Sequence, residues 1–529
     1  MKNNFSKIVV ILFLASVSEC TTIKPPRADF IEDSIKDAVA PTGAAAIAKV
    51  DFRKPPVSSV VLPPNAAAIP QRAFAFNKLT KLEIPDSVTT IGDAAFAFNQ
   101  LSELKLSAKL TTIGAAAFLG NALTTVVIPA DVTTIGERAF AGNSLTSLTL
   151  PSNIDNISSY AFSVNQITSI DMPTSLKVIG DWSFAGNQLT SITIPDGVHT
   201  VGNGAFASNK LQSVIIPASV RFIENAAFAK NKITGFSLPP DITIVNDQLL
   251  YNNQITEIKI PQKVTIIGNG AFAHNAMTNV DIPKNVRSIG SDAFLGNNLT
   301  AITLPPTLNT IGEGCFSLNK IETIKLPSYL KNVPAKAFYK NELQTVTIPG
   351  SVSFIGENAF EDNKLKTITI PSSVRRIEAR AFKNNQLAAI RFVTGVMRTI
   401  GAESFANNVI EKVYIPEGVN FIEDRAFADN KLVSARFPAT LRSIGAGAFA
   451  NNLIETIFLP SSVRTIQEDA FANNPVTVIT ITRNAVISET SFGVYGESFF
   501  ESYNKNKKQS GRFTYNPDDK SWSFRASYY

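Results

Sequence analysis

Apolar and polar positions follow one pattern along this chain, and the pattern returns every 22 residues. A clear copy is Ile135–Pro151, which reads Ile-Gly-x-x-Ala-Phe-x-x-Asn-x-Leu-x-x-Leu-x-Leu-Pro. Leu148 and Leu150 alternate with polar Thr149, and alternation with period two predicts a short strand. The proline that follows lacks a backbone N–H, so it ends the strand there.

A second short extended segment is predicted in each repeat, as at Val132–Ile135, and it turns at Gly136. The next four residues, Glu137–Phe140, predict one tight helical turn with the phenylalanine pointing inward. The chain has 19 such anchor positions, all phenylalanine except Leu250. The anchors are Phe74, Phe96, Phe118, Phe140, Phe162, Phe184, Phe206, Phe228, Leu250, Phe272, Phe294, Phe316, Phe338, Phe360, Phe382, Phe405, Phe427, Phe449 and Phe471.

An asparagine stands three residues after every anchor, from Asn77 to Asn474. A bend in each coil leaves backbone N–H and C=O groups inside, and these groups need hydrogen-bond partners. A side-chain amide has both donors and an acceptor. We therefore expect the asparagines to form a ladder that bonds the backbone of their own and adjacent coils.

A fixed period in the twenties with leucine-type residues at set offsets predicts a leucine-rich-repeat solenoid, mainly β. One face should carry a parallel β-sheet, and the other short extended segments and tight helical turns. Nineteen units at a strand spacing of about 4.8 Å predict a curved rod on the order of 90 Å long. One extra residue near 392–396 shifts the frame once.

Four segments are expected along the chain. Residues 1–20 have a basic start, a short apolar run and Cys20 at the end, which predicts an export signal. Residues 21–56 are a tether and N-terminal cap, 57–492 the solenoid, and 493–529 an aromatic β-hairpin cap. The stretch Leu14–Cys20 resembles a bacterial lipobox, in which the cysteine is acylated, although Glu19 stands where a small residue is usual. Plain secretion by cleavage nearby is the alternative.

The composition argues against nucleic-acid binding, catalysis and metal binding. Net charge is +6, but 49 basic residues are scattered among 43 acidic ones. No arginine-rich run or nucleic-acid module is present, so nucleic-acid binding is not expected. The two histidines, His199 and His274, occupy different repeat slots three coils apart. Cys315 occupies an alanine slot and is expected to be a small buried residue. We predict no enzyme activity, no metal site and no cofactor.

The outward column of the predicted strands is mostly threonine and mixed polar residues up to Thr369. It then changes to Arg391, Tyr414, Arg436 and Phe458. Arginine and aromatic side chains dominate binding energy at protein interfaces, so these four residues are the candidate binding site. Ordinary surface variation is the alternative. In the tail, Tyr515 and Trp522 are expected to cover the last coil, with carbohydrate binding as a second possibility.

The units of the type Val286–Phe294 followed by Leu299–Pro305 resemble the BspA-like leucine-rich repeats, over roughly residues 57–492. The tail Gly511–Phe524 resembles C-terminal segments of some bacterial members. The resemblance implies an exported surface protein, an adhesin that binds host matrix proteins or other cells, attached to the membrane only through lipid. A structural spacer of the cell envelope without a specific ligand is the other hypothesis.

Overall fold

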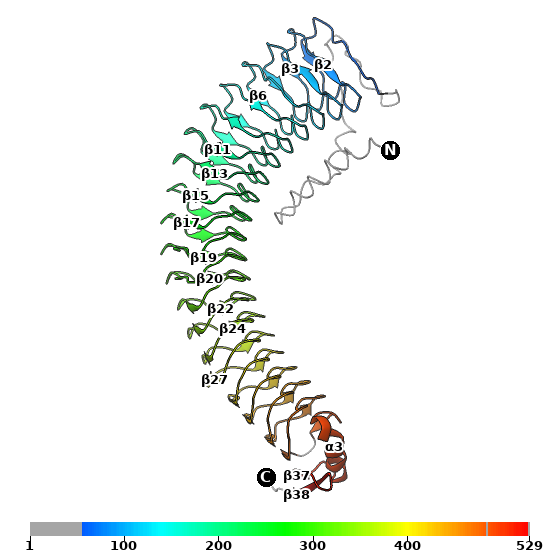
Figure 1. The fold of residues 1–529 in the computed structure, drawn as a ribbon, viewed down its shortest axis with the longest axis vertical. Helices are drawn as coiled ribbons and strands as arrows, with labels where there is room; N and C mark the ends of the chain where they lie inside the picture. The colour runs from blue at the N-terminus through cyan, green and yellow to red at the C-terminus, as the bar shows by residue number, and fades with distance from the viewer. Residues whose placement is uncertain (1–55, 483–484, 527–529) are drawn as a thin grey trace. The chain divides into compact units, whose positions relative to one another are not determined.

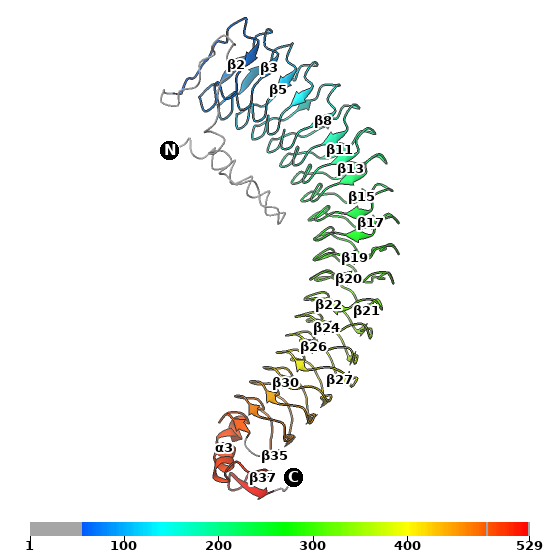
Figure 2. The same cartoon turned by 180° about the vertical axis from the view of Figure 1, so that it is seen from behind.

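The computed structural model describes residues 56–482 and 485–526. They belong to two compact units, which divide the chain between Met277 and Thr278. Within each unit the chain winds through stacked coils, one repeat to a coil (Figures 1 and 2). Residues 1–55, which include the predicted export signal, Cys20 and nearly all of the tether, lie outside the described residues.

The first strand of most coils lies where Leu-x-x-Leu-x-Leu predicts it. These strands pair in parallel with a register of one repeat, as Ile192 does with Val214. Buried and exposed positions alternate, so Ile192 points inward between exposed Ser191 and Thr193. In the first unit they are β2 (Lys81–Glu83), β4 (Glu103–Lys105), β7 (Leu148–Thr149), β9 (Ile170–Asp171), β11 (Ser191–Thr193), β13 (Ser213–Ile215), β15 (Gly235–Ser237) and β17 (Glu257–Lys259). In the second unit they are β21 (Thr323–Lys325), β23 (Thr345–Thr347), β25 (Thr367–Ile370), β27 (Ala389–Phe392), β29 (Lys412–Tyr414), β31 (Ser434–Arg436), β33 (Thr456–Phe458) and β35 (Val478–Ile481).

The second extended segment of each coil is also a paired strand. In the first unit these strands are β1 (Ala68–Ile69), β3 (Thr90–Ile91), β5 (Thr112–Ile113), β6 (Thr134–Ile135), β8 (Asn156–Ile157), β10 (Val178–Ile179), β12 (Thr200–Val201), β14 (Phe222–Ile223), β16 (Ile244–Val245) and β18 (Ile266–Ile267). In the second they are β19 (Ser288–Ile289), β20 (Thr310–Ile311), β22 (Asn332–Val333), β24 (Phe354–Ile355), β26 (Arg376–Ile377), β28 (Thr399–Ile400), β30 (Phe421–Ile422), β32 (Ser443–Ile444), β34 (Thr465–Ile466) and β36 (Val486–Ile487).

The second strands of the coils form a longer continuous β-sheet than the first strands do. From β22 to β36 they form one eight-stranded sheet, whereas the first strands of that unit pair mostly two by two. Proline after the first strand cannot donate to a neighbour. Glycine after the second strand keeps its N–H, and that of Gly114 donates to the carbonyl oxygen of Ile91 at 2.8 Å. The parallel β-solenoid is confirmed, with ladders on two faces of the coil.

The four-residue turn before the anchor lies where predicted, but it is not a helical turn. Arg138 has φ of 57°, in the left-handed region, and the same slot is left-handed in most coils. The amide of Phe140 donates to the carbonyl oxygen of Ala161 in the next coil at 2.9 Å. The expectation of helical geometry at Glu137–Phe140 was therefore wrong. The segment folds as successive turns, with local bonds such as Ala139 N–H to the carbonyl oxygen of Gly136 at 3.2 Å, and alternate amides bond to the next coil.

The extra residue near 392–396 is absorbed outside the ladders. Strands β25 and β27 pair over four positions, from Thr367 with Ala389 to Ile370 with Phe392. On the other face Arg376 pairs with Thr399, 23 positions away, and the ladder continues in register. The loop between β27 and β28 takes up the insertion, so the outward column is not displaced.

The core of each coil is built on its anchor. Neighbouring anchor rings stack nearly parallel, as Phe140 and Phe162 do with ring centres 5.7 Å apart. Phe492 extends the stack beyond the last anchor and lies 5.6 Å from Phe471. These rings are almost fully buried, and each such side chain contributes roughly 1.5–3 kcal/mol of transfer free energy. The stack holds neighbouring coils together.

The predicted asparagine ladder is confirmed. Asn143 donates from Nδ2 to the carbonyl oxygens of Phe118 at 2.9 Å and Phe140 at 3.1 Å. Its Oδ1 accepts from the amide of Leu123 at 3.1 Å. The same three contacts recur at most coils, for example at Asn209 and Asn452. Each amide therefore joins two coils at the corner.

The last coil is followed by four elements, η1 (Gly493–Tyr495), α3 (Gly496–Lys505), β37 (Gly511–Asn516) and β38 (Ser521–Ala526). Strand β37 pairs antiparallel with β35 and also with β38, so a hairpin continues the sheet of first strands. Phe499 of α3 lies edge-on to Phe492 at 4.8 Å and to Phe513 at 5.2 Å. These contacts cover the apolar end of the phenylalanine stack.

Candidate functional site

The four residues singled out from the sequence lie on neighbouring first strands of the second unit. Arg391 is on β27, Tyr414 on β29, Arg436 on β31 and Phe458 on β33. Tyr414 and Arg436 are direct partners in the parallel pair β29–β31. Strands β27 and β29 lie in contact, as do β31 and β33. The structure thus brings the four residues into one line across the sheet, here called the Arg–aromatic row.

All four side chains of the Arg–aromatic row point outward. Tyr414 is 62% exposed and Phe458 is 60% exposed, while the residues after them, Ile415 and Leu459, are buried. Exposed apolar residues also occur elsewhere, so exposure alone does not mark a site. What distinguishes this end of the column is that large aromatic rings alternate with guanidinium groups over four consecutive coils.

The two guanidinium groups of the row are available for a partner. Arg376, Arg380 and Arg425 form ion pairs on other parts of these coils. Over the described residues, neither Arg391 nor Arg436 has a carboxylate in ion-pair contact. Arginine is more weakly hydrated than lysine and binds carboxylates in a bidentate manner, so these two groups suit an interface.

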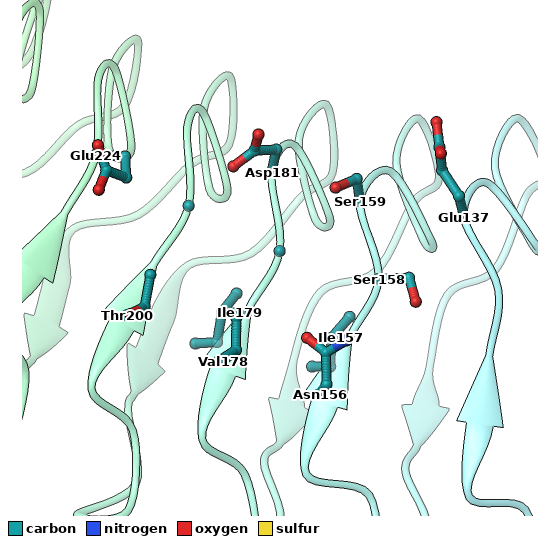
Figure 3. Close-up of a pocket in the computed structure, with 12 residues that line it drawn as sticks. Glu137, Asn156, Ile157, Ser158, Ser159, Val178, Ile179, Asp181, Thr200 and Glu224 are labelled. Carbon is teal, nitrogen blue, oxygen red and sulfur yellow. The ribbon is translucent and has the colours of Figure 1, made fainter.

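A shallow groove of about 460 Å³ lies on the other ladder, in the first unit. Figure 3 shows Glu137, Ser159, Asp181 and Glu224 along its upper edge, each from a different coil. Asp181 accepts hydrogen bonds from the amide of Asn203 at 2.8 Å and from its side chain at 3.2 Å. Glu137 forms an ion pair with Arg138. The carboxylates of Asp181 and Glu137 thus have structural partners, and neither accepts a hydrogen bond from a serine of the groove.

The remaining residues that could carry chemistry, the two histidines and Cys315, do not form a common site. His199 contacts Thr200 through Nδ1 at 3.0 Å, whereas His274 lies edge-on to Tyr251 at 5.4 Å between ring centres. Cys315 is fully buried, and burial raises the pKa of its thiol well above the ordinary value. Across 56–482 and 485–526 no three histidine, cysteine or acidic side chains are grouped so that they could hold a metal ion.

Trp522 and Tyr515 pack against the helical elements that follow the last coil. Trp522 is only 8% exposed and packs against Phe499, with ring centres 5.2 Å apart. Its Nε1 donates to Oγ of Ser498 at 3.2 Å. An aromatic ring must expose a face to stack on a carbohydrate, and the buried Trp522 does not expose one. Tyr515 is half-buried and packs on Tyr495 of η1 and on Trp522, with ring centres 4.4 and 5.3 Å apart. A platform that includes Trp522 is therefore not supported.

Within the described part of the chain, no helix has the length and apolar character needed to cross a bilayer.

Two further arginines, Arg512 and Arg525, lie beside the row on the hairpin. The sequence pattern did not reveal them, because the tail has no repeat to set its register.

The stacked coils, the two parallel ladders and the outward row define a leucine-rich-repeat solenoid, a class that generally serves as a non-enzymatic scaffold for binding other proteins. The repeat model described as "BspA type Leucine rich repeat region (6 copies)" matches residues 45–166, 111–234, 155–279, 265–389 and 376–498. The chain belongs to this BspA-type leucine-rich-repeat family. A search of the curated proteins finds no significant match.

Solved structures of leucine-rich-repeat proteins are similar to this chain. A leucine-rich repeat protein from Bacteroides ovatus is 25% identical, with a TM-score of 0.46, and the match covers 64% of this chain and 91% of that one. YopM from Yersinia enterocolitica is 19% identical, with a TM-score of 0.45 and coverage of 78% and 85%. The pneumococcal vaccine antigen PcpA is 15% identical, with a TM-score of 0.39 and coverage of 70% and 85%.

Proposed function

We propose that this protein is exported, anchored to the membrane through lipid on Cys20, and displayed at the cell surface or outer membrane as an adhesin. Its repeat face binds other proteins, and host matrix proteins or proteins of other cells are the partners we infer. The single observation that carries this proposal is the Arg–aromatic row, in which exposed rings alternate with unpaired guanidinium groups.

The row has the composition of a binding surface. Tyrosine, phenylalanine and arginine are enriched where protein interfaces derive most of their energy. A solenoid presents such residues on strands held by the ladder, so little conformational entropy is lost when a partner binds. Membership in a family whose folds are protein-interaction scaffolds supports the same conclusion.

The binding test uses the purified chain after the export signal. Its capture of immobilised matrix proteins and of whole cells is compared with that of a variant in which Arg391, Tyr414, Arg436 and Phe458 are all serine. A matched control carries serine at Thr303, Lys325, Thr347 and Thr369, which occupy the same outward column. We expect saturable capture that is lost in the first variant and kept in the control.

Two outcomes would contradict this part of the proposal. If the wild-type chain binds no matrix protein and no cell in a saturable way, the protein is a structural spacer of the envelope. If it binds and the four-serine variant binds equally well, the binding face lies elsewhere. Thermal unfolding of all three proteins checks that the substitutions leave the fold intact.

The anchor is tested by Cys20→Ser in the producing cells. We expect wild-type protein in the membrane fraction, labelled by a fatty-acid analogue, and the variant released or retained without label. Equal release of both proteins, with no label on either, would show plain secretion. Lipoproteins carry several acyl chains on one cysteine, and more than one chain is needed for stable anchoring.

A further inference from the structure

The outward column does not end at the last coil but continues across the C-terminal hairpin. Phe458 is paired with Thr480 across β33–β35, and Thr480 is paired with Arg512 across β35–β37. Arg512 is in turn paired with Arg525 across β37–β38. The extended row is the line of outward residues Tyr414, Arg436, Phe458, Thr480, Arg512 and Arg525.

Hairpin and coils share one outward face because the alternation of the strands matches. In β37, Gly511 and Phe513 are buried while Arg512 and Thr514 are exposed. In β38, Trp522 is buried while Arg525 is exposed. The antiparallel hairpin therefore places its arginines on the same side of the sheet as Tyr414 and Phe458.

Positive charge on this face is not balanced by acids. The outward positions of β29, β31, β33, β35, β37 and β38 contain Lys412 and three arginines but no aspartate or glutamate. Glu411 and Glu455 directly precede β29 and β33 and are not among these outward strand positions. Over the described residues, no carboxylate forms an ion pair with Arg436, Arg512 or Arg525.

In the first unit, the outward positions of two first strands show how the chain arranges charges for its own stability. Glu83 on β2 pairs in register with Lys105 on β4, and their side chains form an ion pair of 2.6 Å. Lys81 and Glu103, also in register, form one of 2.7 Å. Like charges directly opposite each other destabilise a sheet. The direct pairing of Arg512 with Arg525 thus has no stabilising role within the hairpin.

We propose that the extended row binds an acidic, extended segment of the partner protein. This inference rests on the proposed adhesin function and specifies the chemistry of its partner. Carboxylates of the segment bind the guanidinium groups, as bidentate pairs where geometry allows. Apolar side chains between the carboxylates pack on Tyr414 and Phe458.

The spacing fits a polypeptide. Arg436 and Arg512 are three strands apart, which is about 14 Å at the usual strand spacing. An extended chain covers that distance in about four residues, and its side chains at positions i, i+2 and i+4 face the same way. Acids at i and i+4 would meet the two arginines, while the residue at i+2 lies over Phe458 and Thr480.

The test uses two synthetic peptides, one with the repeat Glu-Ser-Leu-Ser, which places glutamate and leucine in turn on the same face of an extended chain, and one with glutamine in place of glutamate. We expect the full mature chain to bind the acidic peptide, with an affinity that falls as salt rises, and to bind the glutamine peptide far more weakly. R512Q/R525Q should lower the affinity about tenfold, since hydrogen bonds to charged groups are lost. The charge-matched control K507Q/K508Q, on exposed lysines after α3, should bind as the wild type does.

The inference is overturned if both double variants bind the acidic peptide equally, or if heparin or vesicles with an anionic lipid bind more tightly than the peptide. Capture of matrix proteins and cells is measured in parallel. If wild-type capture persists and neither R512Q/R525Q nor excess peptide reduces it, the adhesin function stands and the acidic-segment inference fails. If capture is absent altogether, the proposed function fails independently of the peptide result.

Discussion

The side-chain amide of Asn143 donates a hydrogen bond of 2.9 Å to the carbonyl oxygen of Phe118, 25 positions earlier in the chain. That bond joins the coil of Asn143 to the one before it. The constant three-residue spacing between anchor and asparagine therefore lets each asparagine bond to the neighbouring coil as well as to the backbone of its own corner.

Replacing Asn143 with alanine should lower the free energy of unfolding by about 1–3 kcal/mol, because the buried N–H of Leu123 loses its acceptor. The carbonyl oxygens of Phe118 and Phe140 each lose one of their bonds and keep the one from Asn121 or Asn165. Hydrogen exchange at Leu123 should accelerate together with the drop in stability. Asn309→Ala, at an exposed position of another coil, is the control and should change little. Equal melting of all three proteins would contradict the ladder.

Gly204 and Gly270 allow a matched comparison, since both occupy the left-handed slot two residues before an anchor, with φ of 53° and 57°. A Cβ on Gly204 would lie 2.4 Å from the ring of Trp182, whereas one on Gly270 would lie 3.3 Å from the flexible side chain of Gln248. Gly204→Ala should therefore destabilise the protein by about 1–3 kcal/mol.

Gly270→Ala shares the left-handed backbone strain and should cost less. Chemical denaturation of the two variants measures the difference, and near-ultraviolet circular dichroism should report the displaced indole only for Gly204→Ala. If both variants were equally stable, the Trp182 contact would not be the cause.

Cys315 should make the protein less stable at alkaline pH. Burial raises the pKa of its thiol in the folded state, while in the unfolded state it titrates near 9.0. Below pH 9 both states keep the proton and there is no effect. Above it the unfolded state loses the proton first, so stability falls with a slope approaching about 1.4 kcal/mol per pH unit.

The measurement is denaturation between pH 8 and pH 10.5 or so in a Cys20→Ser background. Cys315→Ala, which restores the alanine found in most repeats, should remove the extra slope. A thiol reagent should modify Cys315 only after unfolding. Rapid modification of the native protein would show that the thiol is accessible, contrary to its burial.

Tyr503 joins α3 to the end of the solenoid through its hydroxyl. The hydroxyl donates to the carbonyl oxygen of Thr482 at 3.0 Å and accepts from the amide of Ala485 at 3.2 Å. Tyr503→Phe should destabilise the C-terminal elements by about 1–3 kcal/mol, seen as faster proteolysis of the tail. Tyr495→Phe is the control. Its half-buried ring packs on Tyr515, and its hydroxyl forms no hydrogen bond within the described residues.

Arg525→Glu should separate stability from binding. It would place a carboxylate directly opposite Arg512 and replace a like-charge pair with an attractive one. The melting temperature of the C-terminal elements should rise slightly while the acidic peptide is bound more weakly. A fall in both quantities would indicate that Arg525 supports the fold rather than a partner.

The 22-residue period alone determined the solenoid, the anchor positions, the first strands and the asparagine corner, because each of these follows from the side chain at a fixed offset. The outward column that holds Arg391 and Phe458 followed in the same way from strand alternation.

Only the tertiary structure decided three things. The left-handed turn at Arg138 depends on hydrogen bonds to the next coil, and the longer second ladder depends on which amides remain free to pair. The position of Arg512 and Arg525 depends on an antiparallel hairpin whose register no repeat defines. In each case the deciding contact joins residues of different coils, or the tail and the last coil, and a pattern within one repeat does not contain that information.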